Sequence, residues 1–204
     1  MLISFEGIDG TGKATQAMLL QEHLNSIGRS CVYFDFPAYE SFVGKELGNL
    51  LSSDSSSKDH DALTLPPKLM AMLFSLDRMQ FYKDIVSALD KGQVVITNRY
   101  SLSNSVFQSI RAGEDISKWV DQLEHESLGL PRPDYYIVLL GSLDSSKELV
   151  AAKGARNYTK GHDIYEKNEN LLKQAQDLYS NISTPHSKKI IIDCLSNSAF
   201  RTRE

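Results

Sequence analysis

The sequence has few of the features that suit secreted, membrane-embedded or nucleic-acid-binding proteins. Its two cysteines, Cys31 and Cys194, lie in strand-like runs without a CxxC spacing. We therefore expect buried small hydrophobic residues in a reducing compartment, rather than a disulfide or a metal site. No apolar run approaches the roughly 20 residues that a membrane-spanning helix needs. The net charge is −4 and no run of Lys or Arg forms a basic stripe, so no nucleic-acid partner is expected. The first strand-like run begins at Leu2, which leaves no room for a signal peptide and favours a cytoplasmic protein.

What the sequence does contain is a regular alternation of short apolar runs and longer helical patterns. With 204 residues, 41% of them hydrophobic and 24% charged, the chain suits one α/β domain over residues 1–204. The alternation predicts a three-layer α/β sandwich, in which a five-stranded parallel sheet carries helices on both faces. The strands are expected at 2–5, 31–34, 94–96, 136–140 and 190–192. The helices are expected at about 13–27, 42–52, 65–90, 102–127, 143–152 and 163–182.

A glycine-rich turn joins the first strand to the first helix, in the order that phosphate binding requires. Its glycines let backbone N–H groups converge on an anion, and the helix that follows adds the positive end of its dipole. Lys13 would then reach the outer phosphates of a nucleoside triphosphate, as in a P-loop NTPase. A chance glycine turn is disfavoured by the preceding strand, and a GTPase by the lack of an Asn-Lys-x-Asp run. The triphosphate-binding residues are expected to be Gly7, Gly10, Thr11, Gly12, Lys13, Ala14 and Thr15.

The loop departs from its usual pattern directly after the lysine. The usual motif has Ser or Thr there to hold Mg²⁺, whereas this chain has Ala14 and then Thr15. Either Thr15 or water completes the metal shell, or the loop binds phosphate with weaker control over the metal.

A second group of residues suggests a pocket for a phosphate acceptor. Phe74 and Arg78 lie four residues apart on an expected helix and therefore share one face. Their separation of about 5–6 Å along the axis suits the base and phosphate of a nucleoside monophosphate. The alternative, a core Phe74 and a surface Arg78, is equally open. Arg99 follows the third strand, where ligands bind in open α/β sheets, and it either bridges donor and acceptor phosphates or forms a salt bridge across the loop.

Together these pieces resemble the thymidylate kinases, nucleoside monophosphate kinases that make dTDP from dTMP and ATP. The matching runs keep the family's order and span residues 2 to about 193. They are Phe5-Glu6-Gly7-Ile8-Asp9-Gly10-Thr11-Gly12-Lys13, Phe36-Pro37-Ala38-Tyr39, Phe74-Ser75-Leu76-Asp77-Arg78, Asn98-Arg99-Tyr100 with Ser103-Asn104, and Gly129-Leu130-Pro131-Arg132-Pro133-Asp134. The resemblance implies a kinase that uses ATP and Mg²⁺ and forms a homodimer.

The resemblance also implies roles around the nucleoside monophosphate. Asp9 would orient the sugar 3′-hydroxyl and lie near the metal, for which Thr15 is the second candidate ligand. Phe74 would stack on thymine. Arg78 and Asn104 resemble the residues that read the base edge or the acceptor phosphate.

Further positions complete the implied site. Phe36 and Tyr39 would form an aromatic wall, and Phe107 stands near the 2′ position, where it disfavours ribose. Tyr165 would cover the nucleoside. Arg99 is similar to the arginine that binds the acceptor phosphate and helps to neutralise charge during transfer, so Arg99 joins Lys13 and Asp9 as a catalytic candidate.

A polar segment at about 150–165, with Gly154 and Gly161 as hinges, predicts a mobile lid. Gly10 places the chain with family members whose lid supplies the cation missing from the phosphate loop. Lys153, Arg156 and Lys160 are the candidates, and Arg156 is the expected catalytic one.

One further departure keeps other functions open. Asn98 stands where the family has Asp, and an amide attracts Mg²⁺ less than a carboxylate does. Two rivals remain: a kinase of another pyrimidine monophosphate such as dUMP, UMP or CMP, and a degenerate homologue that binds nucleotides with weak or no activity. A scaffolding protein is least favoured, because it leaves two phosphate sites unexplained.

Overall fold

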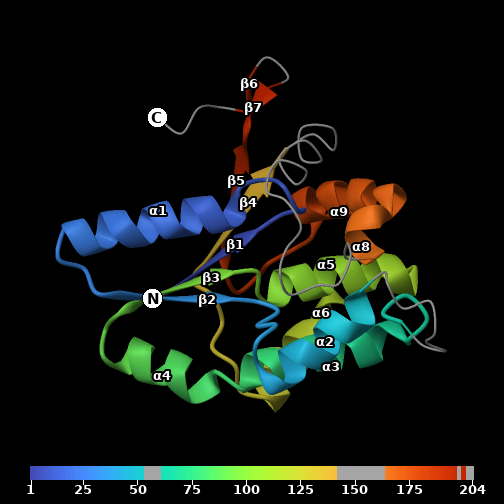
Figure 1. The fold of residues 1–204 in the computed structure, drawn as a ribbon, viewed down its shortest axis with the longest axis horizontal. Helices are drawn as coiled ribbons and strands as arrows, with labels where there is room; N and C mark the ends of the chain where they lie inside the picture. Colours follow the sequence, from blue (N-terminus) through green and yellow to red (C-terminus); the bar gives the residue numbers. More distant parts are fainter. Residues whose placement is uncertain (53–60, 142–163, 197–198, 201–204) are drawn as a thin grey trace.

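The centre of the molecule is a five-stranded parallel sheet (Figure 1). A computed structural model describes residues 1–52, 61–141, 164–196 and 199–200. The strand order is β2-β3-β1-β4-β5, and each neighbouring pair is parallel. The strands are β1 (Leu2–Glu6), β2 (Cys31–Asp35), β3 (Val94–Asn98), β4 (Tyr135–Leu140) and β5 (Lys188–Asp193). All five predicted strands are confirmed, each within two residues of its expected ends. A small antiparallel pair, β6 (Leu195–Ser196) and β7 (Ala199–Phe200), follows β5.

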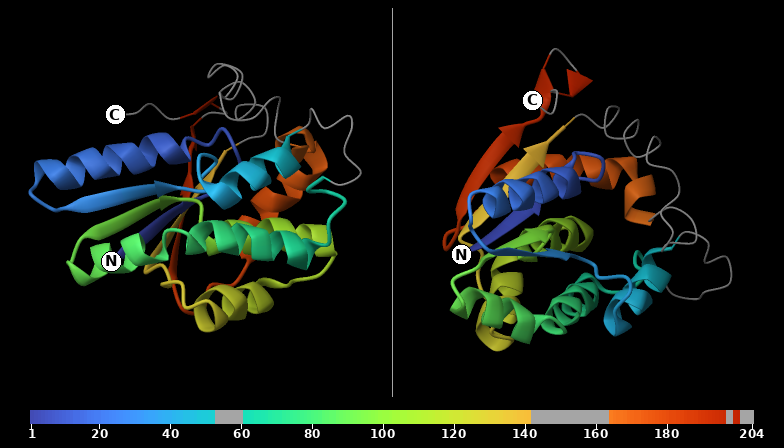
Figure 2. Two further views of the ribbon diagram at one scale, coloured as in Figure 1. Left: turned by 60° about the horizontal axis from the view of Figure 1, so that its bottom comes forward. Right: turned by 60° about the vertical axis from the view of Figure 1, so that its left-hand side comes forward.

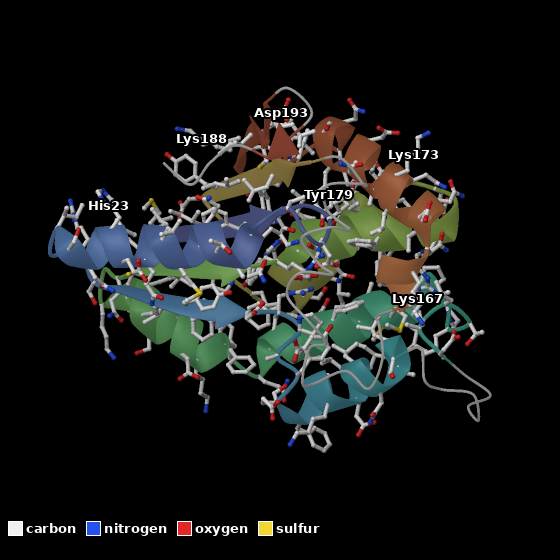
Figure 3. All side chains as sticks on the ribbon, turned by 45° about the horizontal axis from the view of Figure 1, so that its top comes forward. His23, Lys167, Lys173, Tyr179, Lys188 and Asp193 are labelled. Carbon is white, nitrogen blue, oxygen red and sulfur yellow. The ribbon has the colours of Figure 1, made fainter. Side chains whose placement is uncertain are left out.

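Helices cover both faces of the sheet, as the alternating pattern predicted (Figures 1 and 2). Because successive strand residues point to opposite faces, Ile3 and Phe5 pack with α1 (Lys13–Ser26), whereas Leu2 packs with α4 (Tyr82–Asp90). The second face also carries α5 (Ser101–Ala112) and α9 (Glu169–Asn181). Figure 3 shows Tyr179 of α9 pointing into the molecule and Lys173 of the same helix pointing away from it. The predicted three-layer sandwich is therefore confirmed.

Three of the predicted helices are divided in the structure. The segment 65–90 forms α3 (Pro67–Met79) and α4, because the chain turns tightly at Phe81, whose N–H donates to the Arg78 carbonyl at 3.0 Å. The segment 102–127 ends α5 at Gly113, which has a φ of 69°, a conformation that favours glycine. It continues as α6 (Ser117–Asp121) and the π-helical turn η1 (Gln122–Ser127).

A third expected helix is also divided, and the others agree with expectation where the structure describes them. The segment 163–182 is divided into α8 (Ile164–Lys167) and α9, because the side chain of Asn168 caps α9 by accepting from the Leu171 N–H at 3.0 Å. The remaining helix is α2 (Phe42–Leu51), which matches 42–52 closely. The expected helix at 143–152 and most of the predicted lid lie outside the described residues.

The turn between β1 and α1 requires glycine at its first position. Gly7 has a φ of 133°, and a Cβ atom there would lie 2.4 Å from the Leu139 carbonyl oxygen at the end of β4. A side chain at this position would push the loop away from the sheet. Gly7 therefore serves the close approach of loop and strand that holds the phosphate loop in place.

The expectations from composition are met in part. Both cysteines are free, but they are half-buried rather than buried as predicted. The reason for Cys31 is its place on the edge strand β2, where its thiol donates to the Asn25 side-chain oxygen at 3.4 Å. Within the described parts of the chain, none of the helices has the length and apolar character needed to cross a membrane.

Candidate active site

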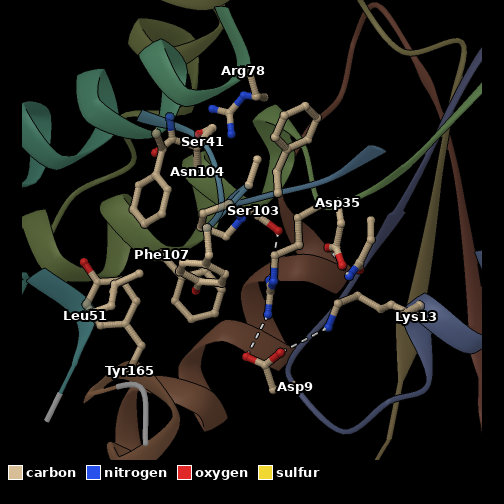
Figure 4. A pocket seen from close by; sticks show the side chains of 18 of the residues that line it. Asp9, Lys13, Asp35, Ser41, Leu51, Arg78, Ser103, Asn104, Phe107 and Tyr165 are labelled. Atoms are coloured by element: carbon tan, nitrogen blue, oxygen red, sulfur yellow. Dashed lines mark hydrogen bonds and ion pairs between the residues drawn. The ribbon is translucent and has the colours of Figure 1, made fainter. Parts of the chain in front are cut away.

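A cavity of about 900 Å³ opens at the carboxyl ends of the central strands, the usual place for ligands in open α/β sheets. The phosphate loop forms one end of it, and α3 and α5 form the other (Figure 4). Most of the predicted site residues meet here, although they come from distant parts of the sequence. Those that line the cavity are Asp9, Gly10, Gly12, Lys13, Ala14, Phe36, Tyr39, Phe74, Arg78, Arg99, Asn104, Phe107 and Tyr165.

Four predicted residues are not brought to the described cavity wall. Gly7 packs against Leu139 instead, as described above, and the buried Thr11 hydroxyl donates to the Ile8 carbonyl at 2.9 Å. Thr15 lies in the first turn of α1 and is not among the described residues that line the cavity. Arg156 lies outside the described residues, as do the other two lid cations.

The phosphate loop presents backbone N–H groups and a nearly buried cation. Gly10 and Gly12 have φ values of 82° and 89°, and no described side chain caps α1 at Gly12. The first N–H groups of a helix have no partner within the helix and attract anions. Lys13 is 5% exposed, and its ammonium group donates to the Ile8 carbonyl at 2.8 Å and lies 3.7 Å from Asp9 Oδ1. This end of the cavity suits a polyphosphate.

Arg99 links the phosphate loop to α5. Its guanidinium lies 2.9 Å from Asp9 Oδ2 and donates to Ser103 Oγ at 3.0 Å and to Tyr179 OH at 3.3 Å. Burial lowers the pKa of Arg99, but the Asp9 carboxylate and other nearby groups outweigh it, so that the pKa is raised. The salt bridge considered from the sequence does form, and it holds the cation at the cavity wall. Figure 4 shows Asp9 at the same end of the cavity as Lys13.

A buried carboxylate lies behind Arg99. Glu6 is fully buried and accepts hydrogen bonds from Ser103 Oγ at 2.5 Å, Ser4 Oγ at 2.9 Å and the Tyr100 N–H at 2.8 Å. Burial raises the pKa of Glu6, and the hydrogen bonds and the charge of Arg99 offset that rise only in part. The sequence analysis did not predict a role for Glu6. A signal was present, because Ser4 and Glu6 are two residues apart on β1 and therefore place two polar side chains on the same buried face of the strand.

At the other end of the cavity, Arg78 is held by an unpredicted partner. Its side chain is 3% exposed, and Nε and Nη2 donate to the two carboxylate oxygens of Glu124 at 3.0 and 2.5 Å. Burial lowers the pKa of Arg78, but Glu124 reverses the effect and the pKa is raised. The view of Arg78 as a surface residue is wrong. Phe74 is half-buried; it packs against the core and also lines the cavity.

Aromatic rings line two further sides of the cavity. Phe36 packs edge-on against Phe81, with centroids 5.7 Å apart, and Phe81 is a lining residue that the sequence did not indicate. Phe107 stacks on Tyr165 at 5.7 Å with an interplanar angle of 13°. The Tyr165 hydroxyl donates to the Ala62 carbonyl at 3.3 Å, which connects α8 to the segment before α3.

Oxygen ligands for Mg²⁺ are present, although no group of three or more His, Cys, Asp or Glu side chains forms a metal cluster within the described ranges. Asp9, Asp35 and Asn98 line the cavity, and Asn98 Nδ2 donates to Asp35 Oδ1 at 2.7 Å. The buried oxygen Asn98 Oδ1 has no hydrogen-bond partner among the described residues. Since Mg²⁺ takes few protein oxygens and completes its shell with water and phosphate, these residues fit the ion.

The parallel sheet and the phosphate loop with Lys13 at the carboxyl end of β1 are the features of a P-loop phosphotransferase. The family model described as "Thymidylate kinase" matches residues 5–199. The chain belongs to the thymidylate kinase family, as its motifs predicted.

Individual relatives agree with this assignment. The thymidylate kinase of Mycobacterium tuberculosis strain H37Rv is 29% identical over 187 residues, covering 90% of this chain and 86% of the relative. The probable thymidylate kinase of Methanocaldococcus jannaschii is 30% identical over 198 residues, which cover 97% of this chain and 89% of the relative. The human thymidylate kinase is 30% identical over 165 residues, which cover 81% of this chain and 68% of the relative. The solved thymidylate kinase from Candida albicans shares the fold, with a TM-score of 0.66 and 24% identity over 94% of this chain and 83% of that one.

Proposed function

We propose that this chain catalyses the ATP-dependent phosphorylation of dTMP to dTDP. An oxygen of the dTMP phosphate attacks the γ-phosphorus of ATP, the bond from that phosphorus to the β,γ-bridging oxygen breaks, and ADP leaves. The observation that carries the proposal is one cavity with two ends. Lys13 and the phosphate loop form the triphosphate end, and Phe74 and Arg78 form an end suited to a base.

Positioning and charge neutralisation carry the catalysis, because the acceptor oxygen is already anionic. Lys13 binds the outer phosphates of ATP, and Arg99 lies where it contacts the acceptor phosphate and the phosphoryl group in transfer. Asp9 holds both cations and orients the sugar 3′-hydroxyl. Arg156, from the lid proposed at about 150–165, would add a further cation.

ATP is the proposed donor, with Mg²⁺ as its metal. When bound, the ion withdraws charge from the β- and γ-phosphates, and Asp9 and Asn98 are the residues that would hold it. Asn98 contributes a neutral oxygen, and Ala14 provides no hydroxyl where the usual loop has one. We therefore expect an active but slow enzyme.

The nucleoside is recognised by rings and by polar groups. Phe74 stacks on the base, with Phe36 and Tyr39 beside it. Arg78 and Asn104 read the base edge, while Phe107 and Tyr165 enclose the sugar. The aromatic ring of Phe107 near the 2′ position disfavours ribose.

An acceptor comparison tests the proposal directly. With ATP and Mg²⁺, we expect dTDP from dTMP, a slower reaction with dUMP, and at least about tenfold lower kcat/KM with UMP, because the pocket rejects a 2′-hydroxyl. ADP release in a coupled assay and direct detection of the diphosphate measure both sides of the reaction. Faster turnover of dUMP, UMP or CMP would assign another monophosphate kinase. A rise in Tm with ATP and dTMP but without dTDP would indicate a non-catalytic nucleotide-binding protein.

The chain is also proposed to act as a homodimer, with residues 1–204 as one domain. On α3, Leu69, Met72 and Leu76 share one face and are 42%, 44% and 44% exposed, more apolar surface than one helix normally leaves in water. The two free thiols support the cytoplasm as the compartment, since thiols stay reduced there.

The dimer proposal predicts a clear effect of one charge. Met72→Glu should raise the dimer dissociation constant at least about 30-fold, because a central apolar contact is replaced by a charge. Sedimentation velocity at several protein concentrations measures this. Leu19→Glu, at a 39% exposed site on α1, is the control and should stay dimeric. A monomeric parent protein at micromolar concentration would contradict the dimer.

A further inference from the structure

Glu124, to which no role has been assigned so far, contacts Arg78 and Asn104. These two residues form the base wall, the part of the cavity wall that is proposed to read the base. Its carboxylate is fully buried. One oxygen accepts from Arg78 Nη2 at 2.5 Å and from Asn104 Nδ2 at 2.8 Å, and the other accepts from Arg78 Nε at 3.0 Å. The residue lies in η1, where the Leu128 N–H donates to the Leu123 carbonyl five residues earlier. Such π-helical turns occur often at functional sites.

The surroundings of Asn104 dictate which way its amide points. The amide nitrogen faces the Ala71 carbonyl at 3.0 Å as well as Glu124. Turning the amide over would place its oxygen against two acceptors. The oxygen Asn104 Oδ1 is buried, has no hydrogen-bond partner among the described residues, and belongs to a residue that lines the cavity. A buried acceptor without a partner is costly, so the site is built to receive a donor there.

Two further residues that line the same cavity offer donors. Arg78 donates from Nε and Nη2 to Glu124, whereas its Nη1 makes no hydrogen bond to the described residues. Gln108, one turn from Asn104 on α5, accepts from Arg111 Nη1 at 2.7 Å with its oxygen. Its buried nitrogen Nε2 has no partner among the described residues, and Gln108 also lines the cavity. The cavity wall thus offers one buried acceptor, Asn104 Oδ1, together with donors from Arg78 and Gln108 that have no described partner.

This pattern complements one kind of pyrimidine. Thymine and uracil present O4 and O2 as acceptors and N3–H between them as a donor. Cytosine presents an amino group at C4 and an acceptor at N3, so that it would place donor against donor at Arg78 and acceptor against acceptor at Asn104. A site with buried polar groups rejects such a mismatch strongly.

We propose that Glu124 is a positioning residue that selects the base: it holds Asn104 as an acceptor and Arg78 as a donor, and so directs the cavity to a pyrimidine with an imide edge. This inference rests on the proposed function and names the part of the chain that sets its acceptor class. Glu124 acts through Asn104 and Arg78 and does not touch the nucleotide.

The test is the binding of dTMP and dCMP to Glu124→Gln, measured by calorimetry without ATP. The parent protein should bind dTMP at least about 100-fold more tightly than dCMP. In the variant, one of the two carboxylate oxygens is replaced by an N–H donor. In one orientation of the amide this donor opposes Arg78 Nε, and in the other it opposes both Arg78 Nη2 and Asn104 Nδ2. In either orientation at least one of the two base-reading residues loses its acceptor and is no longer held in place. The dTMP-to-dCMP ratio should fall at least about tenfold, with ATP binding unchanged within twofold.

Glu126→Gln is the matched control, since Glu126 lies on the same turn, is 60% exposed and pairs with Arg132; its ratio should equal that of the parent protein. Folding of Glu124→Gln is judged by its ATP-dependent rise in Tm. An unchanged dTMP-to-dCMP ratio in the folded variant would overturn this inference and leave the proposed function standing. A parent protein that binds neither monophosphate would overturn both. If Glu124→Gln does not fold, Glu124→Asp replaces it: the carboxylate is drawn back by about 1.5 Å and cannot hold both partners, so the ratio should fall at least about threefold. An unchanged ratio in that variant also overturns the inference.

Discussion

Arg99→Ala is expected to lower kcat for dTDP formation about 10³-fold, the scale of losing a preorganised charge at the reacting group. Arg99 connects Asp9 of the phosphate loop to Ser103 of α5, so it lies between the two ends of the cavity. No other described cation occupies that position, because Lys13 lies over the loop and Arg78 is held by Glu124. The transferred group would therefore lose its nearest fixed positive charge.

The experiment separates charge from geometry and from folding. Arg99→Lys keeps the charge but lacks the planar fork that serves Asp9 and Ser103 together, so its kcat should fall between the parent protein and Arg99→Ala. Arg29→Ala, at an exposed position between α1 and β2, should retain full activity. Steady-state kinetics with dTMP and ATP gives the values, and circular dichroism monitors the fold. A kcat for Arg99→Ala near that of the parent protein would remove Arg99 from the mechanism.

Lys13→Met is expected to reduce kcat/KM for ATP about 10²–10³-fold. The ammonium group of Lys13 is 5% exposed and is already held over the loop by the Ile8 carbonyl. Little conformational entropy is then lost when a phosphate replaces that contact. Methionine keeps the length of the side chain without its charge, so the variant tests the cation rather than the packing.

The two ends of the cavity make this prediction specific. Binding of dTMP to Lys13→Met should stay within about twofold of the parent protein, because Phe74 and the base wall are unchanged. Lys83→Met, at an exposed position on α4, is the matched control and should behave as the parent protein in both assays. Equal ATP kinetics for Lys13→Met and Lys83→Met would refute the phosphate-loop assignment.

The sequence predicted the strands and the phosphate loop well because their signals are local. Short apolar runs bounded by turns predict strands, both for the buried β1 and for β5, whose Ile190, Ile191 and Ile192 are 44%, 44% and 40% exposed. Gly7 has a φ of 133° in the turn itself, a conformation that glycine adopts readily. The helix ends were less well predicted. The end of α5 and the start of α9 carried readable signals in Gly113 and Asn168, but the break at Phe81 depends on how α3 and α4 pack on different partners.

Candidate residues in contiguous motifs meet in the cavity, whereas residues that reach it through distant contacts were not predicted. Asp9, Arg99 and Phe74 belong to runs that also resemble the family, and all three line the cavity. Glu6 lay in a quoted run but its role did not follow, because its burial depends on α5. The lid cations stay a prediction, since they lie outside the described residues.

The sequence by itself therefore determined the class of fold, the glycine-rich loop at one end of the cavity and the family. These depend on residues that are neighbours in the chain or on one helix face. Only the tertiary structure decided how the acceptor end is built. Glu124 is 46 residues from Arg78 and 20 from Asn104 along the chain, and no local pattern links them. Their partnership exists because α3, α5 and η1 pack together, which buries the three polar groups where each must find a partner.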